Sequence, residues 1–284
     1  MALGRDVAGP DGVHPSTGEV GEVLVLTFAT SAQRAGALVE RNIAVNRRQP
    51  WNFISGFFEP VFYLFSIGIG VGALLDGTFT VDGQPMSYAV FVAPAMMAQA
   101  ALSGAMMETT FNFFGKMRFS KLYDAFLATP VRPIELAVGE LTFALMRGGA
   151  YSAAFLILMT VMGLVESWWG VLALPGSLLV GLAAGSFGLA MSTFLRGWQD
   201  FDYVGGVMTV MFLFSGTFTP ITVFPVWMQW LIQITPLYHG VELLRGLTLG
   251  QVHAGLLVHV VYLIALTIGG LWLAQHRMIK LLLR

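Results

Sequence analysis

The sequence predicts an all-α integral membrane protein with six transmembrane helices. Of its 284 residues, 56% are hydrophobic and 11% are charged, and the mean hydropathy is +0.73. Soluble globular proteins carry about 25% charged residues. A spanning helix needs about 20 mostly apolar residues. The predicted spans lie near residues 51–75, 88–111, 134–165, 171–194, 204–218 and 252–274.

The distribution of Lys and Arg predicts that both termini lie in the cytosol. Basic residues gather before the first span, between spans two and three, and after spans four and six. Loops 76–87 and 166–170 carry acidic residues and no Lys or Arg. Because cytosolic loops are enriched in Lys and Arg, the pattern excludes a seven-span model, which would export the basic C-terminal tail.

Two polar segments are expected on the cytosolic side. Residues 1–30 are expected to form a flexible arm, since residues 1–20 are rich in Gly, Pro, Asp and Ser and lack the apolar core of a secretory signal. Residues 31–284 are expected to form the transmembrane domain. Within it, residues 31–48 carry an apolar stripe and end before Pro50, which predicts an interfacial amphipathic helix. The alternative is a plain basic tether.

A short helix is predicted between spans two and three, over residues 120–129. Ser120 can cap it, and Pro130 and Pro133 stop it. Its apolar side chains, flanked by charges, are expected to dock in a groove of a partner protein. The alternative is that this helix lies on the lipid surface. The apolar side chains are Leu122, Tyr123, Phe126 and Leu127.

Four ionisable residues fall within predicted spans, where a charge costs about 2.5–3.5 kcal/mol near the centre of a helix. They are Glu59, Glu108, Glu140 and Arg147. Glu140 and Arg147 are seven residues apart, about 10 Å along one helix face, too far for an ideal direct pair. We therefore expect Arg147 to pair with Glu59 or Glu108. Such a pair either fixes helix packing or lines a substrate path.

The segment 219–250 is apolar but too broken to span a membrane. Pro220, Pro225 and Pro236 interrupt it, so we predict a re-entrant helical hairpin on the outer side, between spans five and six, with Trp227 as an interfacial anchor. His239, Glu242 and Arg245 follow at three-residue spacing and are expected on one side of a short helix. They either brace the hairpin or contact a polar head group.

Several kinds of chemistry are excluded by missing motifs. The chain has no phosphate-loop motif, no H-E-x-x-H and no G-x-S-x-G, and its five histidines lack metal-ligand spacing. We therefore predict no catalytic residue, no metal site and no cofactor on this chain. The formal net charge of −1 gives no indication of nucleic-acid binding, and the absence of Cys excludes disulfides.

Three stretches resemble the ABC-2-type transporter permeases, in particular the NodJ-like branch of lipo-oligosaccharide and drug exporters. They read SGTFTPITVFP followed by PLYHGVELLRG, WNFISGFFEPVFYLFSIGIGVGALL, and KLYDAFLATPVRPIEL. The resemblance covers roughly residues 30–284. It implies a permease subunit of the bacterial cytoplasmic membrane that exports an amphipathic lipid-, glycolipid- or drug-like substrate.

The resemblance also implies partners. Two copies of a separate ATP-binding subunit would bind ATP and Mg²⁺, and a second permease, as a homodimer, would complete the transporter. The predicted cytosolic helix would be the coupling helix that contacts the ATPase through Lys121, Leu122, Tyr123, Asp124, Phe126 and Leu127. The alternative function is a stand-alone secondary transporter or channel that uses the carboxylates Glu59, Glu108 and Glu140.

Overall fold

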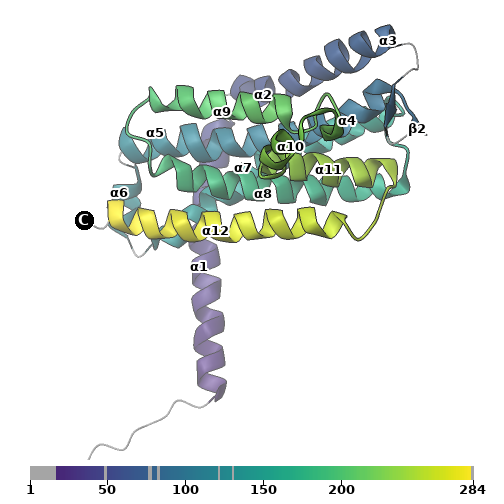
Figure 1. Cartoon of the computed structure of the whole chain (residues 1–284). Coiled ribbons are helices and arrows are strands. Elements are labelled where there is room, and N and C mark those ends of the chain that lie inside the picture. Colours follow the sequence, from purple (N-terminus) through teal and green to yellow (C-terminus); the bar gives the residue numbers. More distant parts are fainter. Residues whose placement is uncertain are drawn as a thin grey trace, which may run out of the picture.

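The computed structural model shows a bundle of long helices that run alongside one another, with one further helix leaving the bundle nearly at a right angle (Figure 1). It describes residues 17–47, 50–75, 79–81, 84–120, 122–129 and 131–282. Five helical segments within this described part are long and apolar enough to cross a membrane. They are Phe57–Leu74, Tyr88–Arg118, Pro133–Val161, Trp168–Ser192 and Leu256–Leu281.

The first two of these segments are continuous helices with wider, π-type turns inside them. The first consists of α2 (Pro50–Tyr63), the π-type segment η1 (Leu64–Val71) and α3 (Gly72–Leu74). The second consists of α4 (Tyr88–Met107), the π-type segment η2 (Glu108–Asn112) and α5 (Phe113–Arg118). The sequence predicted that this span ends near residue 111, which placed Lys116 among the basic residues between spans two and three. The helix itself continues for two more turns, to Arg118.

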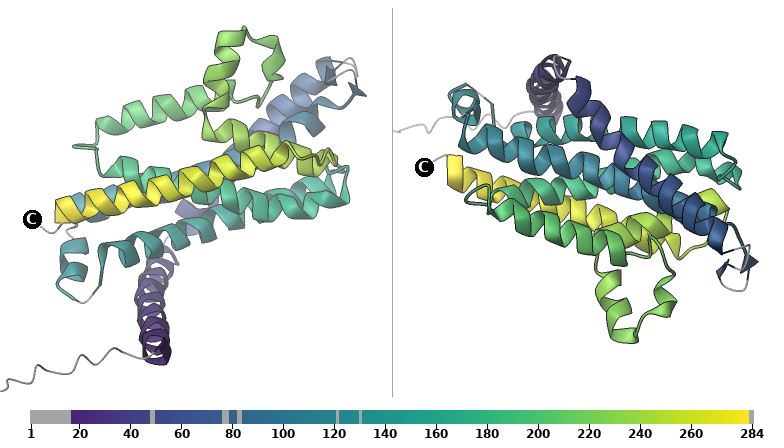
Figure 2. Two further views of the ribbon diagram at one scale, coloured as in Figure 1. Left: turned by 60° about the horizontal axis from the view of Figure 1, so that its bottom comes forward. Right: turned by 90° about the horizontal axis from the view of Figure 1, so that it is seen from above.

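The other long helices are α7 (Pro133–Val161), α8 (Ala173–Ser192), which follows the 3₁₀ segment η3 (Trp168–Leu172), and α12 (Leu256–Leu282). The predicted fifth span corresponds to α9 (Asp200–Phe214), which is 15 residues long. At 1.5 Å per residue it covers about 22 Å, less than the roughly 30 Å of a bilayer core. It lies alongside the other long helices (Figure 2).

Short elements connect the long helices. A small antiparallel hairpin of β1 (Thr80–Val81) and β2 (Gln84–Pro85) lies at one end of the bundle (Figure 1), with Thr80 opposite Pro85. The helix α6 (Leu122–Leu127) lies at the other end, near the C-terminus. After α9 come the 3₁₀ turn η4 (Ile221–Val223), α10 (Val226–Gln233) and α11 (Pro236–Leu249), where the sequence analysis expected a hairpin.

The helix that leaves the bundle is α1 (Thr17–Asn46) (Figure 1). The sequence analysis predicted a helix over residues 31–48 and a flexible arm over 1–30; residues 1–16 lie outside the described residues, and 17–30 are helical. The helix therefore begins 14 residues before the start predicted from the sequence. The polar composition of residues 1–20 concealed the apolar run over residues 23–26 that follows it. The C-terminal half of α1 packs on α7, where Leu38 is buried against Gly139.

Small residues let the central helices approach closely. α4 lies at the centre and is buried along most of its length, in contact with α7, α8 and α11. A Cβ added at Gly104 would lie 3.1 Å from the Cα of Gly148, where α4 and α7 meet. α8 and α12 meet at Gly270, whose added Cβ would lie 2.8 Å from the carbonyl carbon of Ser186. Close backbone contact at small residues is a main source of helix association in membranes.

Gly270→Ala should therefore destabilise the fold, because the new methyl group meets backbone atoms of α8 that cannot rotate away. Overpacking of this kind costs about 1–3 kcal/mol. We expect a lower thermal unfolding temperature of the purified protein in detergent. Gly269→Ala is the matched control, since an added Cβ there meets nothing within 4 Å. Equal unfolding temperatures for the two variants would contradict the proposed α8–α12 contact.

Candidate functional site

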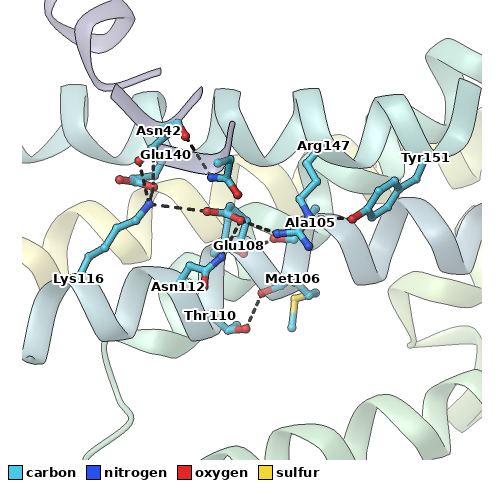
Figure 3. Close-up of polar contacts among 12 residues, drawn as sticks. Asn42, Ala105, Met106, Glu108, Thr110, Asn112, Lys116, Glu140, Arg147 and Tyr151 are labelled. Carbon is cyan, nitrogen blue, oxygen red and sulfur yellow. Dashed lines mark hydrogen bonds and ion pairs between the residues drawn. The ribbon is translucent and has the colours of Figure 1, made fainter. Parts of the chain in front are cut away.

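Four charged side chains form a chain of ion pairs inside the bundle. Arg147 Nη1 lies 3.0 Å from Glu108 Oε2, and Lys116 Nζ lies 3.7 Å from Glu108 Oε1 and 2.6 Å from Glu140 Oε2 (Figure 3). Both glutamates and Arg147 are buried, with exposed fractions of 1%, 0% and 6%. Two carboxylates therefore balance two cations, as buried charges require. We call these four residues the ion network.

Polar neighbours complete the ion network. Asn112 lies one turn after Glu108 on η2, and its Nδ2 donates a 2.7 Å hydrogen bond to Glu108 Oε2. Tyr151, one turn after Arg147 on α7, accepts a 3.0 Å hydrogen bond from Arg147 Nε. These contacts fix the side chains at both ends of the Glu108–Arg147 pair (Figure 3).

The helix α1 also reaches the ion network. Asn42 Nδ2 donates a 3.1 Å hydrogen bond to Glu140 Oε2, and Asn42 Oδ1 accepts one of 3.1 Å from Lys116 (Figure 3). Farther along α1, Ser31 donates a 2.6 Å hydrogen bond to Glu135, near the start of α7. The two hydrogen bonds of Asn42 thus connect α1, which stands outside the bundle, to Glu140 and Lys116 of the ion network.

Of the two partners expected for Arg147, the structure shows Glu108. Glu59 is exposed and, within the described residues, has no ion pair. Glu140 pairs with Lys116, which the sequence analysis missed, as it missed Asn42. Lys116 lies eight residues after Glu108, two turns along the same helix face, and this spacing was the available signal. Asn42 comes from α1, about 100 residues earlier in the chain than Glu140, and no spacing predicts it.

A cavity of about 860 Å³ lies beside the ion network. One part of its lining is polar and includes Gln99, Ser103, Glu108, Lys116 and Arg147. Apolar and aromatic side chains also line the cavity, among them Tyr63, Met107, Phe111, Met208 and Phe212, and Glu59 borders it as well. A molecule with one polar and one apolar part could therefore contact polar and apolar side chains in the same cavity.

Leu122, Tyr123 and Phe126 of α6 do not form the exposed docking stripe that the sequence predicted. Tyr123 is fully buried, and its ring packs against Phe113 at a centroid distance of 5.0 Å. Leu122 and Phe126 are half-buried against the core. The physical reason is that the apolar face of α6 covers the chain's own α5. Of the other residues expected to couple, Lys121 lies outside the described residues, as do the side chains of Asp124 and Leu127.

The exposed surface at this end of the bundle is formed by other residues. Ala125 of α6 is exposed, and Phe119, just before α6, has an exposed fraction of 61%. Phe119 stacks on Trp198, which is 50% exposed, with ring centroids 5.3 Å apart and planes 10° from parallel. We call Phe119, Trp198 and Ala125 the aromatic end surface.

Arg245 braces the loop before the broken segment. Its Nη1 donates a 2.7 Å hydrogen bond to Glu242, its Nη2 donates one of 2.7 Å to the carbonyl of Gly216, and its guanidinium lies 3.8 Å from the ring centre of Phe91. Gly216 has a φ of +73°, which glycine adopts without strain. The guanidinium therefore ties α11 to α4 and to the turn after α9. Trp227 is 65% exposed on α10.

His239 does not join Glu242 and Arg245, contrary to the sequence analysis. Three-residue steps on an α-helix drift by about 60° each, so His239 and Arg245 face directions about 120° apart. His239 Nδ1 lies 2.8 Å from Nδ1 of His259 on α12, and His239 Nε2 lies 2.8 Å from the carbonyl of Gln233. A carbonyl only accepts, so Nε2 carries the hydrogen, and in the neutral ring Nδ1 accepts from His259.

Comparisons with known proteins agree with this architecture. Residues 33–249 match the model of the ABC-2 type transporter family. The chain is 30% identical to Nodulation protein J of Rhizobium leguminosarum bv. viciae over 74% of this chain and 79% of that protein. It is 29% identical to Nodulation protein J of Sinorhizobium fredii over 78% of this chain and 90% of that protein.

A more distant match is the probable multidrug ABC transporter permease YbhR of Escherichia coli K12. It is 26% identical over 58% of this chain and 45% of that protein. The resemblance stated from the sequence motifs is thereby confirmed at the level of the family.

The Glu108–Arg147 pair should show strong coupling in a double-mutant cycle. Glu108→Gln removes the carboxylate that pairs with the buried Arg147, and breaking a buried pair by removing one partner costs about 3–5 kcal/mol. We expect Glu108→Gln/Arg147→Met to lose less stability than the sum of the single variants. Neutralisation is preferable to charge reversal, since an Arg at position 108 would face Lys116.

Thermal unfolding of the purified variants measures this coupling. Glu59→Gln is the control, because Glu59 has no ion pair within the described residues. Additive losses for the two single variants would contradict the buried pair.

Arg245→Lys should destabilise the protein more than Glu242→Gln. A lysine keeps the charge but cannot reach Glu242 and Gly216 at once, because its ammonium lacks the planar fork of a guanidinium. Glu242→Gln retains an acceptor for Arg245, and its side chain is 32% exposed. We expect a loss of about 1.5–3 kcal/mol for Arg245→Lys, as for a hydrogen bond to a charged group, measured by thermal unfolding. The reverse order would show that the salt bridge with Glu242 dominates.

Proposed function

This chain belongs to the ABC-2 type transporter family, and we propose that it is the transmembrane permease subunit of an ATP-driven exporter for an amphipathic lipid-, glycolipid- or drug-like substrate. The observation that carries the proposal is the cavity lined by both polar and apolar side chains, in a bundle of this family. The ion network supplies polar contacts without net charge, and Met107, Phe111 and Phe212 supply an apolar surface. An amphiphile would be accommodated by both.

The energy source in this proposal is ATP hydrolysis by two separate ATP-binding subunits that carry ATP and Mg²⁺. This chain itself has no phosphate-loop motif. The aromatic end surface supports docking of the ATPase at this end of the bundle, since exposed aromatic side chains are enriched in protein interfaces. The helix α6 contributes Ala125 to this surface and would act as the coupling helix, with Lys121, Asp124 and Leu127 among its expected contacts.

The proposed topology has six crossings with both termini in the cytosol of a bacterial cell. The helix α9 would complete the sixth crossing together with residues 215–218 that follow it. Residues 219–250, which contain α10 and α11, would form the re-entrant hairpin on the outer side. The distribution of Lys and Arg supports this orientation, and α1, nearly perpendicular to the bundle (Figure 1), would lie along the inner membrane surface.

A second permease, as a homodimer, would close the cavity in this proposal. The cavity is bordered by α2 and α9, which both expose large apolar side chains. Phe62 of α2 has an exposed fraction of 65%, and Val207 of α9 one of 60%. A pair of such faces would bury these side chains against each other and leave the polar part of the lining inside.

A stand-alone secondary transporter is less consistent with the ion network. Coupling carboxylates in such transporters bind and release ions or protons, whereas Glu108 and Glu140 are each paired with a cation. Purification of the native complex in mild detergent separates the two functions. We expect an ATP-binding subunit to copurify and vanadate to stop efflux of ethidium. Efflux that persists with vanadate and stops with a protonophore would contradict the proposal.

Glu substitutions on the aromatic end surface should weaken ATPase binding. We expect Phe119→Glu and Ala125→Glu to reduce copurified ATPase about tenfold or more, because a central interface residue contributes on the order of 2 kcal/mol. Thermal stability of the permease should change little, since both side chains are exposed. Val252→Glu, at an exposed position in the loop before α12, is the control. Full ATPase binding by both variants would exclude this surface.

A further inference from the structure

We propose that Tyr123 is a positioning residue that connects α6 to the ion network through Glu140. This inference rests on the proposed function, in which α6 receives the movement of the ATPase. The polar hydroxyl group of Tyr123 is buried. Tyr123 is fully buried although α6 has six residues and lies at the end of the bundle.

The hydroxyl of Tyr123 is buried without a well-formed hydrogen bond, and so is Glu140 Oε1. Buried phenols and carboxylates nearly always have partners. The other oxygen of Glu140 is occupied, since Oε2 accepts from both Lys116 and Asn42. The Tyr123 hydroxyl therefore needs an acceptor, and Glu140 Oε1 needs a donor. Each of the two groups can supply what the other needs.

The two groups are close enough to influence each other. Burial first, and then the charge and hydrogen-bonding capacity of Glu140, raise the pKa of Tyr123 well above its usual value of 10. The phenol therefore keeps its hydrogen at physiological pH and remains a donor. A small shift of α6 completes the hydrogen bond from Tyr123 to Glu140 Oε1, and the reverse shift breaks it.

A change at Glu140 propagates to the cavity through the ion network. Lys116 is shared unequally, at 2.6 Å from Glu140 and 3.7 Å from Glu108. A hydrogen bond from Tyr123 partly satisfies Glu140 and lets Lys116 move toward Glu108. Lys116 then competes with Arg147 for the same carboxylate, and both cations line the cavity. Movement of α6 is thus converted into a rearrangement of the polar lining.

The alternative is that Tyr123 only fills space between α5 and α6. Its ring contact with Phe113 fits that role and is independent of the hydroxyl. Tyr123→Phe separates the two roles, since it keeps the ring and removes the donor. Because the hydroxyl has no well-formed hydrogen bond in this state, the variant is expected to fold.

The absence of native cysteine allows a clean readout in the cavity. Ser103→Cys places a thiol in the cavity lining, and its labelling by a fluorescent maleimide reports on the polar lining. The experiment uses the full complex with its ATPase in liposomes, with and without ATP and vanadate. In the parent we expect ATP to change the labelling rate about fivefold or more, as for a typical coupling free energy.

With Tyr123→Phe we expect the ATP-dependent change to be largely lost, with unchanged ATPase copurification and hydrolysis. Tyr203→Phe, an exposed tyrosine on α9, is the matched control and should behave as the parent. Adding Tyr123→Phe to Glu140→Met should have no further effect, because Glu140→Met already removes the acceptor.

A full ATP-dependent change in Tyr123→Phe would overturn the inference and leave the proposed function intact. Failure of the parent chain to bind any ATPase would overturn the proposed function and the inference with it. The two failures are distinguishable, since the second is seen without any substitution at Tyr123.

Discussion

The free energy required to bury charge in an apolar bundle is the constraint on which the rest of the structure depends. Glu108, Glu140, Lys116 and Arg147 lie among helices selected for membrane insertion, and each acquires an opposite charge within 4 Å. Without its partners each charge would oppose insertion. The positions of α4, α5 and α7 relative to one another are therefore limited to arrangements that bring these four side chains together.

The same requirement draws peripheral segments into the bundle. The oxygen atoms of Glu140 have more acceptor capacity than Lys116 can use, and Asn42 of α1 supplies a further donor. A helix outside the bundle is thereby attached to its interior. At the broken segment Arg245 plays a comparable part, since its guanidinium joins α11 to the backbone of Gly216 and the ring of Phe91.

Close packing at small residues makes parts of the bundle rigid, whereas the ion network can pair in more than one way. Contacts such as Gly104 with Gly148 and Gly270 with Ser186 bring helix backbones close together and leave little room for movement. The ion network has a cation shared between two carboxylates, so its members have more than one way to pair. In an exporter a rigid frame of closely packed helices would surround a polar centre that can rearrange.

The family and the all-helical membrane architecture were predictable from the chain alone. Hydropathy reflects transfer of each segment into lipid, a property of local composition, and it located all five candidate spans to within a few residues at most ends. The second and last of these candidate spans each run seven residues past their predicted ends, at residues 111 and 274, since the basic residues there suggested loops where the helices continue. The helix α9 shows the limit of the same signal, because apolar residues beyond Phe214 do not continue the helix.

Pairing of side chains from different helices was less predictable. The sequence reduced the possible partners of Arg147 to Glu59 and Glu108. Which of the two pairs with Arg147 depends on the orientation of α2, η2 and α7 about their helix axes. The contact of His239 with His259 has the same origin, since the small drift of a three-residue step turns His239 toward α12.

The sequence by itself therefore determined the class of protein, the helical segments and the set of charges that had to be neutralised. Tertiary structure alone decided that Lys116 joins Glu108 to Glu140, that Asn42 reaches them from α1, and that Tyr123 faces inward. The physical reason is that lipid solvation acts on each segment independently, whereas hydrogen bonds and ion pairs depend on distances of a few ångströms between segments.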